Sequence, residues 1–286
     1  MGEGMIAVTG ASGNVGGAVV GDLVDDGDRE VVALVRDLSR LHDGGTHRVR
    51  VADYAQPAAM KAALEGVETL VFVSSDGETA PMLMHHCAVV RAARDAGVEH
   101  LVYLSIIDVE RGSPFCYAAV HRETERLLRT SGVSHSVVRA GLYGEFFARW
   151  VVQAAKSGVL RLPVGSGQMS LVSRSDVARS LAAAARQAPS GPQLITGNNT
   201  YSLQQLAALT EQLAQTRVKP EDCDERAFGC ELLQGGTSPW WAYAFTTMFQ
   251  SVRDHRYELI TGHLTQLTGR APIPFDDIAA HALDAG

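Results

Sequence analysis

Short apolar runs and stretches of helical period alternate along the first half of this 286-residue chain. The run from Met5 to Val8 has the length and continuity of a buried parallel strand. From Val15 the apolar residues recur every three or four positions, which predicts a helix. The same alternation predicts further strands over 31–35, 48–52, 69–74, 100–104 and 136–139, and helices over 57–64, 80–96 and 116–130. Short connections between such elements are typical of βαβ units, so we predict an α/β fold with a doubly wound parallel sheet.

The pattern changes after Gly141. It predicts helices over 146–155, 174–186, 202–213 and 239–257, and strands over 159–162, 168–172 and 193–196. The segment 219–234 is poorly patterned, and a flexible gating loop is one interpretation of it. We therefore predict a first domain over 1–140 and a smaller, discontinuous C-terminal α/β lobe over 141–286, some segments of which return to the first domain. This lobe is expected at the carboxyl edge of the sheet, where ligands of such sheets bind.

Three glycines stand between the first strand and the first helix, in the sequence TGASGNVG. Gly10, Gly13 and Gly16 have the spacing G-x-x-G-x-x-G. In this context the first glycine allows a sharp turn, the second lets a pyrophosphate approach the backbone, and the third lets helix and strand pack closely. The free N–H groups of the helix then face the anion. The motif predicts a Rossmann domain that binds a dinucleotide, and a turn of purely structural function is the alternative.

Polar residues at the ends of the next strands extend the predicted cofactor site. Arg36 follows the second strand, and its guanidinium favours the 2′-phosphate of NADPH, whereas the carboxylate of Asp37 leaves NADH as the second choice. Asp53 follows the third strand and is expected to reach the adenine. Ser74 and Ser75 follow the fourth and are expected along the middle of the cofactor. The alternative for each is a solvated or turn-forming residue.

Composition and charge restrict the class of partner. The formal net charge is −7, which gives no support to nucleic-acid binding. Apolar runs of membrane-spanning length are absent, and the first strand begins almost at once, so neither a membrane span nor a signal peptide is expected. The four cysteines are scattered without a C-x-x-C pair, so no disulfide framework and no metal site are predicted. The expected location is the cytoplasm, and a homodimer is compatible with the sequence.

Candidate proton-transfer groups follow the fifth predicted strand. Ser105 ends that strand, while Tyr117 and His121 lie four residues apart in the next predicted helix. They share one face of it with Glu125. A phenol and an imidazole beside a nicotinamide could supply or relay the proton that accompanies hydride transfer. The alternatives are a packing tyrosine and a surface histidine paired with Glu125.

Aromatic residues gather in the predicted lobe. Tyr143 and Phe146 follow the sixth strand, while Trp241, Phe245 and Phe249 recur every four residues in one helix. Such a face is typical of a core, but it would also suit a flat, apolar substrate that few polar groups orient. Tyr143, Phe146, Trp241 and Phe245 are therefore the candidate substrate-binding residues.

Several of these stretches together resemble one family. The residues Thr9 to Gly16, Arg36, Ser105, His121 to Glu125 and Ser136 to Tyr143 are similar to the NmrA-like branch of the atypical short-chain dehydrogenases, in particular to bacterial NAD(P)H:quinone oxidoreductases. The likeness extends over nearly the whole chain. It implies that the pyrophosphate is held by Gly10, Ser12, Gly13, Asn14 and Val15, the 2′-phosphate by Arg36, the adenine by Asp53 and the ribose side by Ser74 and Ser75.

One position departs from the wider dehydrogenase pattern. In most extended dehydrogenases a Tyr-x-x-x-Lys pair transfers the proton, whereas this chain has Tyr117-x-x-x-His121 in that register. Histidine is shorter than lysine and less cationic at neutral pH, so a standard tyrosinate mechanism is not expected. A quinone needs less assistance than a ketone, because its reduction gains aromaticity and the anion formed is delocalised.

Two functions from different classes stay open at this point. The first is an NAD(P)H-dependent oxidoreductase that transfers hydride to a quinone or a related conjugated carbonyl, with a polycyclic aromatic polyketide quinone of an antibiotic pathway as one hypothesis. NADPH is the expected cofactor, and NADH is the alternative. The second function is a non-catalytic redox sensor that binds the dinucleotide and a protein partner, and the missing lysine keeps it open.

Overall fold

The computed structural model describes every residue except 1–3, 26, 28–29 and 41–47. The chain divides into two compact units. Unit 1 comprises Met1–Ile106, Val120–Arg139 and Ser175–Gln193, and unit 2 comprises Ile107–Ala119, Ala140–Arg174 and Leu194–Gly286. Residues 107–119 therefore lie in unit 2, although they precede the predicted boundary at 140, and residues 175–193 lie in unit 1.

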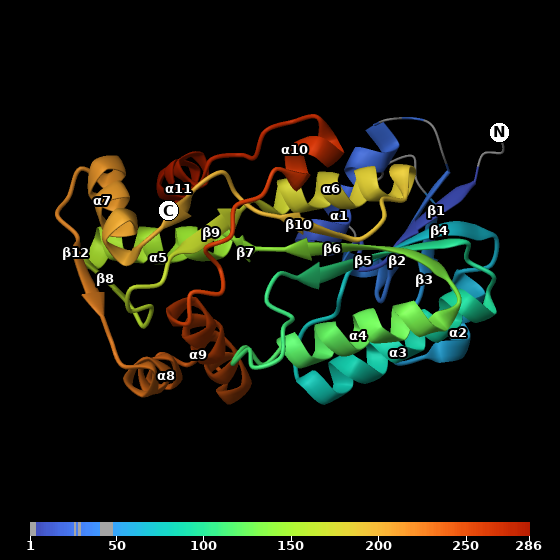
Figure 1. The fold of residues 1–286 in the computed structure, drawn as a ribbon, viewed down its shortest axis with the longest axis horizontal. Coiled ribbons are helices and arrows are strands. Elements are labelled where there is room, and N and C mark those ends of the chain that lie inside the picture. Colours follow the sequence, from blue (N-terminus) through green and yellow to red (C-terminus); the bar gives the residue numbers. More distant parts are fainter. Residues whose placement is uncertain (1–3, 26, 28–29, 41–47) are drawn as a thin grey trace. The chain divides into compact units, whose positions relative to one another are not determined.

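Unit 1 is built around a seven-stranded sheet (Figure 1). Its strands are β1 (Met5–Val8), β2 (Val31–Val35), β3 (Arg48–Val51), β4 (Val67–Phe72), β5 (His100–Ile106), β6 (Ser134–Ala140) and β10 (Pro192–Ile195). Its helices are α1 (Asn14–Asp25), the 3-10 turn η1 (Leu38–Arg40), α2 (Pro57–Ala63), α3 (Thr79–Asp95), α4 (Ala118–Ser131) and α6 (Arg174–Gln187). The elements predicted for this region are confirmed, with bounds that differ by a few residues.

The strand order is β10-β6-β5-β4-β1-β2-β3. Strand β1 pairs in parallel with both β2 and β4, and the ladders β2–β3 and β4–β5 are parallel as well. Strands β2 and β3 therefore extend the sheet on one side of β1, and β4, β5, β6 and β10 extend it on the other. This is the doubly wound arrangement that was predicted. The order reverses between β1 and β4, and ligands of such sheets bind at this switch point.

Helices cover both faces of this sheet (Figure 1). Helices α2, α3 and α4 lie on one face, where the ring of His86 in α3 bonds to the hydroxyl of Thr124 in α4. Helices α1 and α6 lie on the other, where Arg186 of α6 donates to the carbonyl of Asp22 in α1. Because both faces are covered, a strand such as β2 is buried at every position and reads as a continuous apolar run.

Unit 2 combines short strands with helices. Its strands are β7 (Leu142–Tyr143), β8 (Val159–Leu162), β9 (Met169–Val172), β11 (Thr200–Tyr201) and β12 (Lys219–Asp222). Its helices are α5 (Gly144–Ser157), α7 (Leu203–Ala214), α8 (Glu225–Gln234), α9 (Pro239–Arg253), α10 (His263–Thr268) and α11 (Phe275–Asp284). Strand β9 pairs in parallel with β7 and antiparallel with β11, and β8 pairs in parallel with β12. Its core is rich in aromatic side chains, with Phe147, Phe249 and Phe275 fully buried.

Several stretches of unit 2 differ from the sequence predictions. The segment 219–234 is not a loop, because Lys219–Asp222 forms the edge strand β12 and Glu225–Gln234 forms α8, which begins at the side-chain cap of Asp224. Its strand and helix are both too short to show a clear period. The helix predicted over 239–257 ends at Arg253, and His255 follows with a left-handed backbone φ of 61°. Strands β7 and β11 and helices α10 and α11 were not predicted.

Candidate active site

The glycine turn joins β1 to α1 in a conformation that requires glycine at two positions. Gly10 has a φ of +63°, which favours glycine. A Cβ on Gly16 would lie 2.2 Å from the carbonyl oxygen of Gly10, so only glycine lets α1 start this close to the turn. The amide of Gly13 donates to the same oxygen at 2.9 Å. Ser12, Gly13 and Asn14 are exposed, so the amino end of α1 is accessible to an anion.

The end of β4 is fixed directly against this turn. The amide of Val73 donates to Oγ1 of Thr9 at 2.9 Å, and the phenol of Tyr54 donates to the carbonyl of Val73 at 3.0 Å. A Cβ on Gly10 would come within 3.6 Å of the Val73 side chain. Burial raises the pKa of Tyr54, so it is a neutral donor. Tyr54 is therefore part of the scaffold that holds the β1 and β4 ends together.

The other predicted cofactor residues lie around the same strand ends. Arg36 is exposed and follows β2 directly. The carboxylate of Asp37 accepts the amide of Ser39 at 3.0 Å, and that of Asp53 accepts the amide of Ala55 at 2.9 Å. Each acid thus forms its own local turn, while Arg36 extends into solvent.

Ser74 and Ser75 follow β4 and are half-buried. Oγ of Ser75 is buried and lacks a hydrogen-bond partner among the described residues. An orphaned hydroxyl beside an accessible glycine turn fits a bound dinucleotide, because the ribose hydroxyls of such a ligand could complete its hydrogen bonding. The residues of this edge therefore fit NAD(P)H.

A buried polar cluster connects α3, β5 and α4. It consists of His86, Tyr103, His121 and Thr124, whose exposed fractions are all 3% or less. The phenol oxygen of Tyr103 lies 2.7 Å from Nδ1 of His121 and 3.4 Å from Nδ1 of His86. Nδ1 of His86 lies 2.8 Å from Oγ1 of Thr124, which donates to the carbonyl of Val120. The sequence prediction included His121 but missed the others, because a buried strand tyrosine and a helix histidine carry no motif.

Both histidines of the cluster are uncharged. Burial lowers the pKa of His121 to about 3. Burial, together with the neighbouring imidazoles of His121 and His85, lowers that of His86 to about 2. A positive charge in this buried cluster would lose its hydration, which disfavours the protonated rings. His121 is therefore not a surface histidine paired with Glu125, which was one sequence interpretation, and it does not replace the lysine charge.

The hydrogen-bond network assigns the tautomers of both rings. Nε2 of His86 accepts the amide of Ser75 at 3.2 Å, so its hydrogen is on Nδ1 and points to Thr124. The phenol oxygen of Tyr103 lies closest to Nδ1 of His121, at 2.7 Å, and the hydroxyl of Thr124 is also within hydrogen-bonding range. We assign the Tyr103 proton to this shortest contact, which places the hydrogen of His121 on Nε2. His121 is therefore a neutral hydrogen-bond donor.

Ser105 and Glu125 belong to a second buried group. The Ser105 hydroxyl donates to Oε1 of Glu125 at 2.8 Å. The guanidinium of Arg139 binds the same carboxylate through Nε and an NH2 group, at 2.9 and 2.7 Å. Glu125 is 3% exposed, so this bidentate pair supplies the charge compensation that a buried carboxylate requires. The group fixes α4 against β5 and β6.

Tyr117 lies outside the helix in which it was predicted. Helix α4 begins at Ala118, and Tyr117 belongs to unit 2. Its ring packs against Phe115 at 5.3 Å and Trp240 at 6.2 Å between ring centroids. The segment around it is held to α9, because the amide of Cys116 donates to Oγ1 of Thr247. Tyr117 is half-buried.

Three of the four predicted substrate-binding residues form one run of rings in unit 2. Trp241 and Phe245 of α9 lie 5.6 Å apart, and Phe245 lies 5.0 Å from Phe146 of α5. All three are half-buried, unlike Phe249, which is fully buried in the core. Tyr143 packs elsewhere, with the guanidinium of Arg174 over its ring at 5.5 Å.

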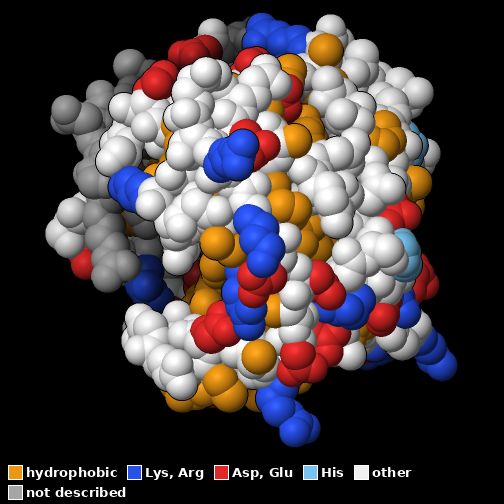
Figure 2. Space-filling view, turned by 90° about the vertical axis from the view of Figure 1, so that its left-hand side faces the viewer, with side chains coloured by type: hydrophobic (Ala, Val, Ile, Leu, Met, Phe, Trp, Pro, Cys, Tyr) orange, Lys and Arg blue, Asp and Glu red, His pale blue; other side chains and the backbone are white. Residues whose placement is uncertain are grey.

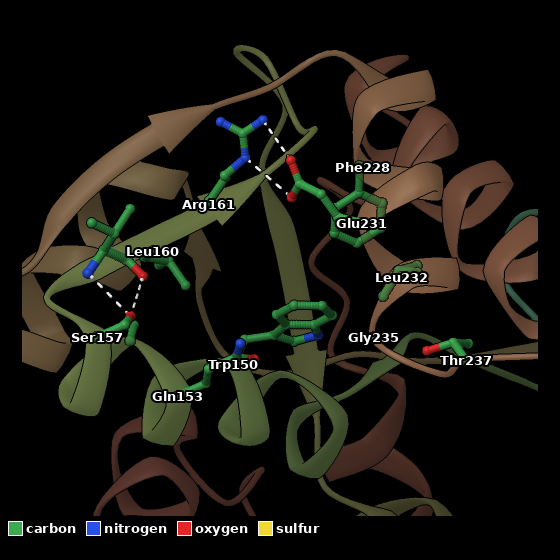
Figure 3. A pocket seen from close by; sticks show the side chains of 12 residues that line it. Trp150, Gln153, Ser157, Leu160, Arg161, Phe228, Glu231, Leu232, Gly235 and Thr237 are labelled. Atoms are coloured by element: carbon green, nitrogen blue, oxygen red, sulfur yellow. Dashed lines mark hydrogen bonds and ion pairs between the residues drawn. The ribbon is translucent and has the colours of Figure 1, made fainter.

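Unit 2 also contains a cleft of about 420 Å³ between α5, β8 and α8. On this face, hydrophobic side chains lie beside a row of arginine and carboxylate side chains (Figure 2). Trp150 of α5 points toward Phe228 and Leu232 of α8, and the ion pair of Arg161 with Glu231 closes one end (Figure 3). The cleft is not lined by any of the four predicted substrate-binding residues.

Two kinds of feature are absent from the described ranges. None of their helices is long and apolar enough to span a bilayer. Nor do three or more His, Cys, Asp or Glu side chains in them gather as a metal site would require.

The doubly wound sheet and the glycine turn of unit 1 are typical of folds that bind a dinucleotide. A family profile described as NAD(P)H-binding matches residues 10–188. The chain belongs to this NAD(P)H-binding family.

Known relatives agree with this assignment. Quinone oxidoreductase 2 of Escherichia coli K12 is 32% identical over 239 residues, which cover 81% of this chain and 82% of that protein. The (4-alkanoyl-5-oxo-2,5-dihydrofuran-3-yl)methyl phosphate reductase of Streptomyces griseus is 30% identical over 292 residues, covering 98% and 99%. The crystal structure of the E. coli NADPH-dependent quinone oxidoreductase complexed with NADPH has a TM-score of 0.91 at 28% identity, covering 97% of this chain and 99% of that one.

The expected likeness to NmrA-like reductases and bacterial quinone oxidoreductases is confirmed. The chain is an NAD(P)H-dependent oxidoreductase, as predicted.

Proposed function

We propose that this protein transfers hydride from NAD(P)H to a quinone or a closely related conjugated carbonyl. The observation that carries the proposal is the state of His121, which stands where many dehydrogenases have lysine. It is buried, its pKa is lowered to about 3, and Tyr103 occupies its Nδ1. This position therefore offers a neutral N–H donor instead of a cation. A substrate that forms a localised alkoxide would be poorly served by such a group, whereas a quinone delocalises the charge that it gains.

The proposed roles of the side chains follow from this state. NAD(P)H, when bound, supplies a hydride, and the quinone that takes up this hydride and one proton becomes a hydroquinone. His121 donates a hydrogen bond from Nε2 to a quinone oxygen and keeps its own proton, in the manner of a neutral imidazole electrophile. Tyr117 is the second candidate donor, and water is the source of the proton. The catalytic function predicted for Ser105 stays a prediction, since its hydroxyl hydrogen is engaged by Glu125.

The proposed cofactor contacts are those of the glycine turn and the neighbouring strand ends. Gly10, Ser12, Gly13, Asn14 and Val15 would hold the pyrophosphate. Ser74 and Ser75 would lie along the ribose, and Asp53 would reach the adenine. Arg36 is exposed at the end of β2, where its planar guanidinium suits a 2′-phosphate. We therefore infer a preference for NADPH, which is also the cofactor named in the complex of the E. coli quinone oxidoreductase.

The proposed substrate is flat and conjugated. The half-buried rings of Phe146, Phe245 and Trp241 form a continuous apolar surface, which supports binding of a polycyclic quinone. Tyr143 is kept as a candidate on sequence grounds. The names of two relatives describe a quinone and an unsaturated furanone phosphate as substrates. Both are conjugated carbonyl compounds, so an activated enone is the second class to test.

Steady-state oxidation of NADPH tests this proposal, with NADH in parallel. The acceptors are a benzoquinone, a naphthoquinone, a polycyclic hydroxyquinone, an unsaturated furanone and a simple aliphatic ketone. We expect turnover with quinones and none with the aliphatic ketone. His121→Ala should lower kcat, whereas a surface variant such as His281→Ala should not.

Tight binding of NADPH without turnover on any acceptor would support the redox sensor instead. Unchanged tryptophan fluorescence with the polycyclic quinone would argue against the aromatic site.

A further inference from the structure

The turn after β4 is fixed by side chains from three separate parts of the chain. Thr9 and Tyr54 hold Val73 at the start of this turn. Two residues later, the amide of Ser75 donates to Nε2 of His86, which comes from α3. A backbone amide at a cofactor-binding edge is usually satisfied by other backbone groups or by water. Here a side chain holds it, and that side chain lies in the protein interior.

His86 has the properties of a dedicated acceptor. It is 0% exposed, and its ring packs edge-to-face on Phe72 with a centroid distance of 5.1 Å. Both ring nitrogens are used, Nε2 by Ser75 and Nδ1 by Thr124. Thr124 in turn donates to its own helix at Val120. The imidazole therefore has neither a spare hydrogen-bonding site nor room to rotate, so its orientation is fixed.

This contact leaves Ser75 with one unused polar group. The amide of Ser75 is taken by His86, while its Oγ is buried without a partner in the part of the chain that is described. A buried hydroxyl without a partner is costly unless a ligand completes its bonding. The turn lies beside the glycine turn, at the switch point between β1 and β4, where the middle of a dinucleotide binds in such folds.

We propose that His86 is a positioning residue for the cofactor, which holds the Ser75 turn in the geometry that receives the ribose of NAD(P)H. The inference rests on the proposed placement of Ser75 at the cofactor. His86 does not contact the reacting atoms in this proposal. It acts through the Ser75 amide, so its loss should weaken cofactor binding and have much less effect on the rate at saturating cofactor.

Two amide variants separate this function from simple packing. His86→Gln keeps an acceptor near the position of Nε2, whereas His86→Asn keeps a group near Nδ1 and cannot reach Ser75. Both variants lose the ring, and asparagine leaves the larger cavity by one methylene, so the free energy of unfolding of each variant is measured beside its NADPH affinity. We expect His86→Asn to raise the Kd and the KM for NADPH at least about tenfold, a change of about 1.4 kcal/mol. We expect His86→Gln to stay within about threefold of wild type, with kcat nearly constant in both.

Amide hydrogen exchange gives a readout that does not depend on activity. The Ser75 amide should be protected in wild type and in His86→Gln, and should exchange at least about tenfold faster in His86→Asn, while amides within β4 keep their protection. Equal NADPH affinity in the two variants, or equal protection of Ser75, would overturn the proposal. If His86→Asn fails to fold, ¹⁵N NMR of wild type decides, because a hydrogen on Nε2 of His86 is incompatible with the contact.

The result that would refute the proposed function differs from the one that would refute the His86 proposal. Wild-type protein that binds NADPH but reduces no quinone would refute the quinone reductase and leave the His86 comparison intact. If the wild type reduces quinones but the two His86 variants have equal NADPH affinity and equal protection of the Ser75 amide, only the positioning function of His86 is refuted.

Discussion

The phenol oxygen of Tyr103 lies 2.7 Å from Nδ1 of His121, and both side chains are buried. Tyr103 is on β5 and His121 is on α4, so the contact joins the sheet to the helix that covers it. With the phenol assigned as the donor to Nδ1, the hydrogen of His121 is on Nε2, which makes this residue a neutral donor. Most consequences for catalysis and for pH dependence follow from this pair.

Tyr103→Phe removes the donor to Nδ1 and lets His121 adopt either tautomer. We expect kcat with a quinone to fall about five- to fiftyfold, with little change in the KM for NADPH. The loss of one buried hydrogen bond should lower the free energy of unfolding by about 1 kcal/mol. Steady-state kinetics and urea unfolding measure the two effects. An unchanged kcat would show that the tautomer of His121 does not matter for turnover.

The buried histidines should make the protein sensitive to acid. Burial lowers the pKa of His121 to about 3 and that of His86 to about 2, whereas the ordinary value of 6.5 applies to the unfolded chain. Below pH 6.5 the unfolded state therefore binds more protons, so stability falls as the pH is lowered toward the folded pKa values. Between pH 6.5 and 5, each buried histidine should lower the free energy of unfolding by on the order of 2 kcal/mol.

Urea unfolding at a series of pH values checks this prediction. The variant His86→Gln/His121→Asn should show a flatter dependence between pH 6.5 and 5 than wild type, even if it is less stable at pH 7.5. A variant of the C-terminal helix, His281→Gln, is the control and should keep the wild-type slope. Parallel curves for all three proteins would mean that the two buried rings do not determine the acid sensitivity.

For the Glu125–Arg139 pair, we expect a single substitution to lower the free energy of unfolding more than the substitution of both residues does. Arg139→Met leaves a carboxylate buried without a counter-ion, and should lower the free energy of unfolding by about 3–5 kcal/mol. The double variant Glu125→Met/Arg139→Met removes both charges and should recover a large part of that loss. Chemical denaturation of the three proteins measures the coupling. Additive losses would show that the pair is not energetically coupled.

Two glycines of α1 offer a matched comparison. A Cβ on Gly16 would lie 2.2 Å from the carbonyl oxygen of Gly10, whereas a Cβ on Gly21 meets nothing within 4 Å. Gly16→Ala should therefore displace the glycine turn and raise the Kd for NADPH more than about tenfold or prevent folding. Gly21→Ala should bind normally and gain about 0.5–1 kcal/mol in stability, because alanine favours a helix. Equal binding by both variants would contradict the predicted pyrophosphate site.

Arg36→Ala tests the cofactor preference. If the guanidinium binds the 2′-phosphate, kcat/KM for NADPH should fall about ten- to a hundredfold while that for NADH changes little. Asp37→Ala is the matched neighbour, because its carboxylate accepts the Ser39 amide in a local turn, and it should affect both cofactors alike. A parallel loss with NADPH and NADH in Arg36→Ala would show that this residue does not select the phosphate.

The sequence predicted the dinucleotide-binding half well because its signals are local. Apolar runs identify strands that are buried on both faces, and the requirement for glycine at Gly10 and Gly16 is set by backbone within a few residues. The segment 219–234 was harder, since β12 is a short edge strand whose partner β8 lies about sixty residues earlier. Its pairing depends on tertiary contacts that leave little pattern in the segment itself.

The sequence by itself determined the fold class, the glycine turn and the residue types at the strand ends, because each depends on neighbours along the chain. Only the tertiary structure decided that His121 is a neutral donor, that Glu125 pairs with Arg139, and that His86 holds the Ser75 amide. These contacts join residues from different elements, and their charge states depend on burial. Burial is a property of the folded chain, and for a single polar residue no local pattern encodes it.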